Sequence, residues 1–252
     1  MERKIPKKLH YIWVGGGKKN ALMDRCIQSW KTCCPDYEII EWNEKNFDTK
    51  GHPWVQKAIE QRNWALASDV MRVIILEKHG GIYVDTDIEL IKPLDDFLHH
   101  SFFIGYESPH WVNSAIIGSE PNHPIMRVIA KRYDKPPEFN GTTNIHTVHA
   151  YTAALKLLYD NRPKEGLVVT DDFATYPREY FYPIHYLTGK MKKRTANTYA
   201  IHHYSKTWHG KSTRFFEKVA HAGRIFIWPF YWFFELQVAR SWRRDLVREF
   251  KS

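Results

Sequence analysis

The apolar residues near the start of the chain follow two different spacings. Residues 9–14 and 37–42 are short runs rich in β-branched and aromatic side chains, which favour strands, and the first run ends in three glycines. Between them, residues 22–33 place apolar side chains at helical spacing and are followed by Pro35. This order predicts a β-α-β unit. Such units favour a parallel sheet with ligands bound beyond the carboxyl ends of its strands.

The same alternation continues along the chain and predicts an α/β fold. One or two helices are expected over residues 54–79, closed by Gly80-Gly81, and a strand that leads into an acidic pair follows at once. The further predicted elements are strands at 101–107, 113–119, 168–170 and 199–201 and helices at 123–133 and 151–159.

Two carboxylates, Asp85 and Asp87, stand one residue apart at the end of this apolar strand. In an extended chain alternate side chains share a face, so we expect both carboxylates on one side and Thr86 on the other. Two anions facing the same space repel unless a cation lies between them. Mn²⁺ and Mg²⁺ take carboxylate oxygens together with phosphate oxygens. Most Asp-x-Asp triplets are solvated turns, but the apolar lead-in favours a metal site that grips a nucleotide diphosphate.

Asp69 and Arg72 lie three residues apart on the predicted helix that leads to this strand, so they share one helix face. The simplest interpretation is an intrahelical ion pair. Their proximity to Asp85 favours a larger role. The guanidinium could bind phosphate or hydroxyls through its fork of donors, and the carboxylate could accept hydrogen bonds from sugar hydroxyls.

Further polar and aromatic positions are candidates for ligand contact. His202 and His203 follow a short apolar run, so one imidazole is expected at a strand end as a third metal ligand, with a surface position as the alternative. Trp13 could stack on a nucleobase while Gly15–Gly17 let the backbone approach a ligand. Asn113 could bind a sugar or act as a cap.

Length and composition limit the class of protein. A chain of 252 residues can bury one sizeable core. Cys26, Cys33 and Cys34 lack the paired spacing of a metal motif or a disulfide framework, so free thiols are expected. The basic N-terminus is not followed by a secretory signal, and the apolar run 225–234, interrupted by Pro229, is shorter than the ~20 residues of a membrane span. We therefore expect a cytosolic protein.

Residues 211–252 carry more than half of the net charge of +9, because they hold nine Lys or Arg against four acids. From residue 228 onward, aromatic and apolar side chains fall on one helical stripe, with four arginines mostly off it. A cationic, aromatic helix suits the headgroup region of an anionic membrane, and a core-packing helix is the alternative. We expect a catalytic domain over 1–210 and an amphipathic extension over 211–252, placed peripherally at the inner face of the plasma membrane.

Six segments occur in an order that is specific. They are Ile5–Gly16, Cys26–Trp30, Pro35–Glu38, Ser68–Arg72, Gly80–Asp87 and Asn113–Gly118. Together they resemble the bacterial sugar transferases of glycosyltransferase family 32, which carry a DxD signature and are related to yeast initiating mannosyltransferases and clostridial glucosylating toxins. The resemblance covers roughly the first half of the chain.

The resemblance implies a GT-A fold, a Rossmann-like nucleotide-sugar domain with a mostly parallel central sheet. It also implies a nucleotide-sugar donor, Mn²⁺ or Mg²⁺, and retention of the anomeric configuration. By position it assigns the nucleotide to Trp13, Val14 and Gly15, ribose and donor sugar to Asp69, Arg72 and Asn113, and sugar hydroxyls and metal to Asp85, Asp87 and His202. Thr207-Trp208 resembles the Ser-Trp element that closes the family's domain, with Thr in place of Ser.

The predicted function is the metal-dependent transfer of a hexose from UDP-hexose to a glycan or lipid-linked oligosaccharide in surface polysaccharide synthesis. A metal-dependent nucleotidyl or phosphoryl transferase would also use Asp85 and Asp87, but residues 15–19 lack the spacing of a Walker loop. A nucleic-acid-binding protein would follow from the charge alone. That class is not expected, because an acidic pair beside a polyanion site would weaken binding.

Overall fold

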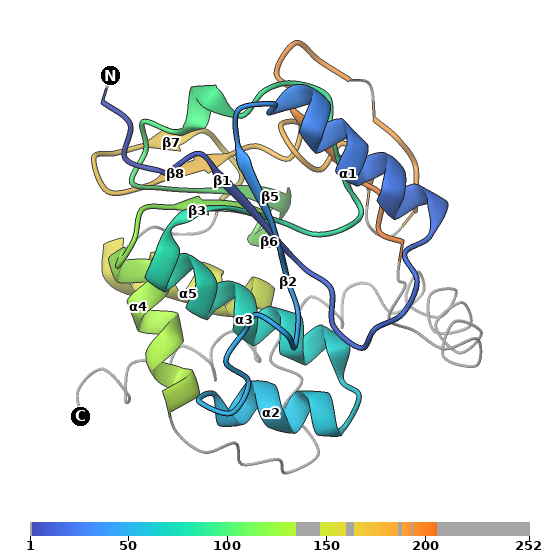
Figure 1. Ribbon diagram of the computed structural model, residues 1–252. Coiled ribbons are helices and arrows are strands. Elements are labelled where there is room, and N and C mark those ends of the chain that lie inside the picture. The colour runs from blue at the N-terminus through green and yellow to red at the C-terminus, as the bar shows by residue number, and fades with distance from the viewer. Residues whose placement is uncertain (1, 135–146, 160–163, 186–187, 193, 206–252) are drawn as a thin grey trace, which may run out of the picture.

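A computed structural model describes residues 2–134, 147–159, 164–185, 188–192 and 194–205, which form helices on both faces of one central sheet (Figure 1). The helices are α1 (Ala21–Cys33), α2 (Pro53–Glu60), α3 (Trp64–His79), α4 (Pro124–Lys131) and α5 (Thr147–Tyr159), with 3-10 turns at Asp95–Phe97 and Arg132–Asp134. The strands are β1 (Lys8–Ile12), β2 (Glu38–Trp42), β3 (Gly81–Val84), β4 (Ile88–Leu90), β5 (Phe102–Ser108), β6 (Trp111–Ser119), β7 (Val168–Val169), β8 (Ala174–Tyr176) and β9 (Ala200–His202).

The central sheet has the strand order β2-β1-β3-β6-β5-β8-β7 within the described residues. β1 pairs in parallel with both β2 and β3, and β5 pairs in parallel with β8, whereas β6 and β7 run against their neighbours. Most strands therefore point the same way, which confirms the predicted α/β fold with a mostly parallel sheet. β4 and β9 form a separate antiparallel pair.

The sheet separates two apolar cores. Helices α3, α4 and α5 cover one face, with α2 packed beyond α3, and α1 covers the other face together with β4 (Figure 1). Trp30 on α1 is fully buried, and its indole N–H donates to the Ile88 carbonyl at 2.7 Å. This bond fixes α1 to β4, the strand that follows the acidic pair.

Helix α3 has capping groups at both ends. The Asn63 side chain accepts a hydrogen bond from the Leu66 amide at 3.2 Å, and the helix stops at Gly80, whose φ is +60°. The predicted helical region 54–79 is thus two helices, and the turn between them contains Arg62 at φ +54°. These caps fix where α3 ends, so they fix how its polar residues face β3.

Gly81 allows α3 to pass directly into β3. Its φ is +98°, and a Cβ atom there would lie 2.8 Å from both the Lys8 carbonyl oxygen and the His10 Nε2 atom of β1. A side chain would therefore force β1 and β3 apart. Gly81 is required by this close contact between two parallel strands, whereas a Cβ at Gly80 would meet Pro121.

Most predicted elements are confirmed with ends shifted by a few residues. The helix predicted at 151–159 begins earlier, at Thr147, and the three-residue strands β4 and β8 were not predicted. The three cysteines are free, as expected. In the described part of the chain, no helix combines the length and apolar character needed to cross a membrane. The predicted extension 211–252 lies outside the described residues.

Candidate active site

The acidic pair lies in a tight turn between β3 and β4. The Ile88 amide donates to the Asp85 carbonyl at 3.0 Å, which closes this turn. The prediction that Asp85 and Asp87 share one face of an extended strand is therefore wrong, because β3 already ends at Val84. The turn nevertheless brings the carboxylates together, since one oxygen of each lies within 4.8 Å of the other and of a His202 ring nitrogen.

Arg72 joins α3 to this turn. Its Nη2 atom lies 3.0 Å from Asp69 Oδ1 and 3.1 Å from Asp85 Oδ1, so the predicted intrahelical ion pair is present and extends to Asp85. Its Nη1 atom donates to Ser114 Oγ at 2.8 Å and to the Ser114 carbonyl at 2.9 Å. Because protein groups engage both Nη atoms, Arg72 holds Asp69 and Asp85 in place, and its contact with a donor sugar stays a prediction.

Tyr83 completes the surroundings of this guanidinium. Its hydroxyl donates to Asp85 Oδ1 at 2.8 Å, and its ring centroid lies 4.4 Å from the Arg72 guanidinium carbon. Burial raises the pKa of Asp85, and Arg72 opposes that shift without cancelling it. The pKa of Arg72 stays above its usual value, because Asp85 and Asp69 outweigh the effect of burial. The ionised form of Asp85 therefore depends on neighbouring positive charge.

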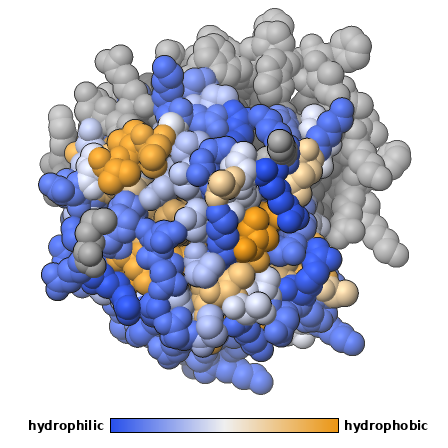
Figure 2. All heavy atoms as spheres, turned by 90° about the horizontal axis from the view of Figure 1, so that it is seen from above, coloured by the Kyte–Doolittle hydropathy of each residue, from blue (hydrophilic) through white to orange (hydrophobic). Residues whose placement is uncertain are grey.

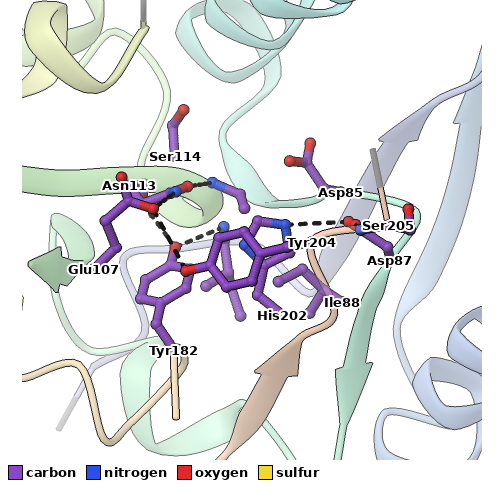
Figure 3. A network of polar contacts seen from close by, with 12 residues as sticks. Asp85, Asp87, Ile88, Glu107, Asn113, Ser114, Tyr182, His202, Tyr204 and Ser205 are labelled. Carbon is purple, nitrogen blue, oxygen red and sulfur yellow. Dashed lines mark hydrogen bonds and ion pairs between the residues drawn. The ribbon is translucent and has the colours of Figure 1, made fainter. Parts of the chain in front are cut away.

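Strand β9 carries His202 to the other carboxylate. His202 is paired with Ile88 across the β4–β9 ladder, and its Nε2 atom lies 3.3 Å from Asp87 Oδ1. The Ser205 amide donates to Asp87 Oδ2 at 2.8 Å (Figure 3). Burial alone would raise the pKa of Asp87, but His202 and Ser205 outweigh it and hold that pKa well below its usual range. Burial lowers the pKa of His202, but the neighbouring Asp87 carboxylate raises it by more, so the pKa of His202 lies above its usual value.

Asp85, Asp87 and His202 form a group that fits a divalent cation. Two carboxylate oxygens and one imidazole nitrogen lie within 4.8 Å of one another. The His202 Nδ1 atom is buried and has no hydrogen-bond partner among the described residues, so one ring nitrogen is not committed to the protein. Carboxylates suit Mg²⁺ and Mn²⁺, whereas imidazole suits transition metals. The donor set therefore fits a divalent metal ion.

The two adjacent histidines have different environments. His203 points to the other side of β9, where its Nε2 atom lies 2.7 Å from Glu89 Oε2. Its backbone amide, in contrast, donates to the Asp87 carbonyl at 3.1 Å. Within the described residues, the geometry thus assigns the imidazole of the metal group to His202 and gives His203 a separate carboxylate partner.

Asn113 lies on β6, one residue before the Ser114 that binds Arg72. Its Nδ2 atom donates to Glu107 Oε2 at 2.5 Å, and its Oδ1 accepts from the Ala115 amide at 2.7 Å. Its carbonyl accepts from the Tyr182 hydroxyl at 2.8 Å (Figure 3). The side chain is therefore held by protein contacts next to the carboxylates, and its contact with the donor sugar stays a prediction.

The predicted nucleotide segment follows β1, the parallel neighbour of β3, so both strands end at the same edge of the sheet. The Trp13 indole N–H donates to the Gly17 carbonyl at 2.6 Å, and Val14 is buried. Gly15 has φ +84°, and a Cβ there would lie 2.7 Å from the Trp64 ring. The glycine thus allows the segment to pack tightly against Trp64 at the start of α3.

Thr207 and Trp208 lie outside the described residues. The sequence did not single out Tyr83, Ser114, Glu107, Tyr204 and Ser205 as site residues. For Tyr83 a signal existed, because residues two apart in a strand share a face, and Asp85 lies two residues further on. The other four come from β5, β6 and the segment after β9, so only the tertiary fold brings them to the carboxylates.

Comparison with known proteins shows that the chain is similar to glycosyltransferases. Residues 21–104 match the family described as "Glycosyltransferase sugar-binding region containing DXD motif". The chain is 24% identical over 230 residues to inositol phosphoceramide mannosyltransferase 3 of Schizosaccharomyces pombe, an alignment that covers 88% of this chain and 61% of that protein. It is 32% identical over 141 residues to mannosyl phosphorylinositol ceramide synthase SUR1 of Saccharomyces cerevisiae, covering 52% of this chain and 36% of that protein.

Among solved structures, the chain is similar to the PaToxG glycosyltransferase, with a TM-score of 0.50, 19% identity and coverage of 62% of this chain and 70% of that one. This likeness concerns the fold. The chain spans less than two thirds of the length of the two yeast relatives named above. The match of residues 21–104 and the named relatives support the predicted glycosyltransferase of the DXD type, and the structural likeness supports the predicted GT-A fold.

Proposed function

We propose that the protein is a metal-dependent, retaining glycosyltransferase that moves a hexose from a nucleotide-sugar to a glycan or lipid-linked glycan acceptor in surface polysaccharide synthesis. The observation that carries the proposal is the group of Asp85, Asp87 and His202 at the carboxyl edge of β3. Open α/β sheets bind nucleotides at this edge. A carboxylate and imidazole set beside the nucleotide segment is suited to a cation that binds a diphosphate.

The residues of the site would divide the chemistry as follows. Asp85, Asp87 and His202 would hold the divalent ion, which when bound supplies positive charge toward the departing nucleoside diphosphate. Arg72 keeps Asp85 and Asp69 in fixed positions through its buried ion pairs. Asp69 and Asn113 would then orient the sugar, because fixed hydrogen-bonding groups cost no reorganisation during reaction.

Retention is proposed to occur on one face of the sugar. The leaving phosphate oxygen would take the proton of the acceptor hydroxyl as that hydroxyl attacks the anomeric carbon. Proton nuclear magnetic resonance of the product should show the anomeric configuration of the donor. An inverted product would contradict the retaining mechanism, and a glycosyl-enzyme adduct in mass spectrometry would contradict the absence of a covalent step.

The proposed donor is a UDP-hexose. Relatives named as inositol phosphoceramide mannosyltransferases support testing nucleotide-mannose donors beside it, and the inositol phosphoceramide in their name supports a lipid-linked acceptor here. A panel of UDP- and GDP-sugars should show hydrolysis of one donor that requires Mn²⁺ or Mg²⁺ and stops with chelator. No metal-linked hydrolysis and no metal-linked binding of any such donor would overturn the proposal.

A nucleotidyl or phosphoryl transferase is the second candidate, because it would also use paired carboxylates and a metal ion. The products separate the two classes. A glycosyltransferase releases a nucleoside diphosphate, whereas a nucleotidyl transferase releases pyrophosphate or a nucleoside monophosphate conjugate. Chromatography of the nucleotide products therefore decides between them.

A further inference from the structure

The backbone is strained at Tyr204, directly after β9. Its φ is +49°, in the left-handed region that a bulky side chain rarely adopts. Arg62 and Asn122 are the other non-glycine residues with positive φ in the described part of the chain, and both are exposed on turns beside helices. Strain of this kind persists only where surrounding contacts hold it, and it often marks a functional site.

Two contacts hold the Tyr204 side chain. Its ring lies against the His202 ring, with centroids 3.9 Å apart and an interplanar angle of 34°. Its hydroxyl lies 3.5 Å from Glu107 Oε2, a long contact with the carboxylate that also accepts from Asn113 (Figure 3). The ring therefore packs directly on an imidazole of the proposed metal group and limits how that imidazole can move.

The turn at Tyr204 also determines what surrounds Asp87. Just before it, the His203 amide donates to the Asp87 carbonyl at 3.1 Å. Just after it, the Ser205 amide donates to Asp87 Oδ2 at 2.8 Å. A left-handed residue between them reverses the chain so that both amides point at the same aspartate. Oδ2 is then occupied, and Oδ1 faces His202 at 3.3 Å.

We propose that Tyr204 is a positioning residue of the metal group, acting through its left-handed backbone on Asp87 and through its ring on His202. The inference rests on the proposed function, because it assumes that this group binds a divalent ion. It does not require Tyr204 to touch the ion or the donor. Residues that orient metal ligands typically change metal affinity by about 10- to 100-fold when they are replaced.

Three substitutions separate the two contributions. Tyr204→Phe keeps both ring and turn, so Mn²⁺ affinity in the presence of UDP should stay within about threefold of the unchanged chain. Tyr204→Asn loses the ring but tolerates the left-handed conformation, and the affinity should fall by about tenfold. Tyr204→Val loses the ring and disfavours the turn, and the fall should approach about 100-fold.

Asn122→Val is the matched control. Asn122 also has a positive φ, +59°. It follows the end of β6, and that end pairs with the start of β3, whereas Asp85 follows the end of β3. Asn122 therefore lies at the opposite edge of the sheet from Asp85. This variant should lose thermal stability as Tyr204→Val does, yet keep its Mn²⁺ affinity. Mn²⁺ affinity would be measured by isothermal titration calorimetry and by electron paramagnetic resonance of the free ion.

The outcomes separate this inference from the proposed function. The positioning role is supported if Mn²⁺ affinity decreases from Tyr204→Phe to Tyr204→Asn to Tyr204→Val and stays unchanged in Asn122→Val. The positioning role is overturned if Tyr204→Phe and Tyr204→Val bind Mn²⁺ with equal affinity, or if Asn122→Val loses as much affinity as Tyr204→Val. Neither result contradicts the proposed metal site. An unchanged chain that binds neither Mn²⁺ nor Mg²⁺ in the presence of any nucleoside diphosphate overturns both proposals.

Discussion

At the scale of single residues, Arg72 is the group on which the arrangement of carboxylates depends. Its side chain is only 6% exposed and contacts Asp69, Asp85 and Ser114 together. A lysine carries the same charge but has no planar fork of donors, so it cannot make these three contacts at once. We therefore expect the substitution Arg72→Lys to be disruptive.

The Arg72→Lys variant should lose kcat/KM by on the order of 100-fold, because Asp69 and Asp85 lose their common anchor. Its thermal unfolding temperature should also fall, since two partly buried carboxylates are left with a poorer partner. Steady-state kinetics with the identified donor and thermal denaturation measure these effects. A variant with unchanged kcat/KM would show that the fork of donors is not needed for turnover.

Two carboxylate and histidine pairs, Asp87 with His202 and Glu89 with His203, lie at the β4–β9 ladder and permit a second test at this scale. Asp87→Asn should weaken Mn²⁺ binding by at least about 100-fold, because a neutral amide replaces a charged ligand. Glu89→Gln alters the neighbouring carboxylate, whose partner is His203 at 2.7 Å, and should leave Mn²⁺ binding within about threefold. Equal losses in the two variants would mean that charge near β4, and not ligation by Asp87, controls binding.

At the scale of elements, the junction of α3 and β3 sets the position of the acidic turn. Gly81→Ala should destabilise the protein by more than about 2 kcal/mol, because the φ of +98° is unfavourable for alanine and its Cβ would meet Lys8 and His10 of β1. Gly189→Ala is the control, since Gly189 has φ +64° but no atom within 4 Å of the place where a Cβ would lie. Its cost should be about 1 kcal/mol.

Urea denaturation measures both free energies of unfolding. The difference between the two variants reports the steric contact between β1 and β3, because the conformational penalty of a positive φ is shared. Equal destabilisation would show that β1 can move away from β3 at little cost, and that Gly81 is not needed for strand packing.

The contact between α3 and β1 also predicts a dependence of stability on pH. His10 is fully buried, donates from Nε2 to the Gly80 carbonyl at 2.9 Å and accepts at Nδ1 from the Trp42 indole at 3.0 Å. Burial lowers the pKa of His10 from 6.5 to about 4, with a smaller contribution from His79. The neutral ring satisfies both partners, whereas a protonated Nδ1 would lose the indole donor.

The pKa of His10 is lower in the folded protein than in the unfolded chain. The contribution of His10 to the free energy of unfolding is therefore fully present above pH 6.5 and is lost as the pH falls toward about 4. The loss should reach about 3 kcal/mol. In His10→Gln, whose amide can both donate and accept, the free energy of unfolding should depend less on pH over this range. Urea denaturation at several pH values tests this prediction. If the free energy of unfolding depends on pH equally in His10→Gln and in the unchanged protein, His10 does not cause the pH dependence.

These elements also show what a sequence can and cannot predict. The ion pair of Asp69 and Arg72 was predictable because helical geometry relates residues three apart. The two proposed metal-binding aspartates can be recognised from a local pattern. The sequence predicts that an extended strand brings their carboxylates together, but in the structure a turn does so. Strands β4 and β8 have three residues each, too few to show a two-residue period. The choice between His202 and His203 required the register of β4 against β9, which is a long-range property.

At the scale of the whole molecule, the described surface offers little apolar area for a bilayer. Hydrophilic residues predominate around small apolar patches in the face seen in Figure 2. Among the described residues, the exposed large hydrophobic side chains are Leu167, Val169 and Met191. We therefore propose that membrane contact belongs to residues 211–252, with their excess of positive charge, at the cytosolic face of the plasma membrane.

Deletion of residues 224–252 should release the protein from liposomes that contain anionic lipid, because Trp, Phe and Arg side chains of the extension are removed. Metal-dependent donor hydrolysis should continue, since Asp85, Asp87 and His202 are retained. Liposome sedimentation and a hydrolysis assay measure the two properties separately. A truncated protein that still sediments with the liposomes would assign membrane contact to another surface.

The pairing of β4 with β9 has a consequence for assembly of the molecule. Asp85 and Asp87 are made early in the chain, but their imidazole partner arrives 115 residues after Asp87, in the last described strand. An ion held by all three residues would cross-link the turn between β3 and β4 to strand β9. Nascent or proteolysed fragments that stop before β9 should thus be unable to retain it, and saturating Mn²⁺ should slow cleavage of the intact chain by protecting its closing segment.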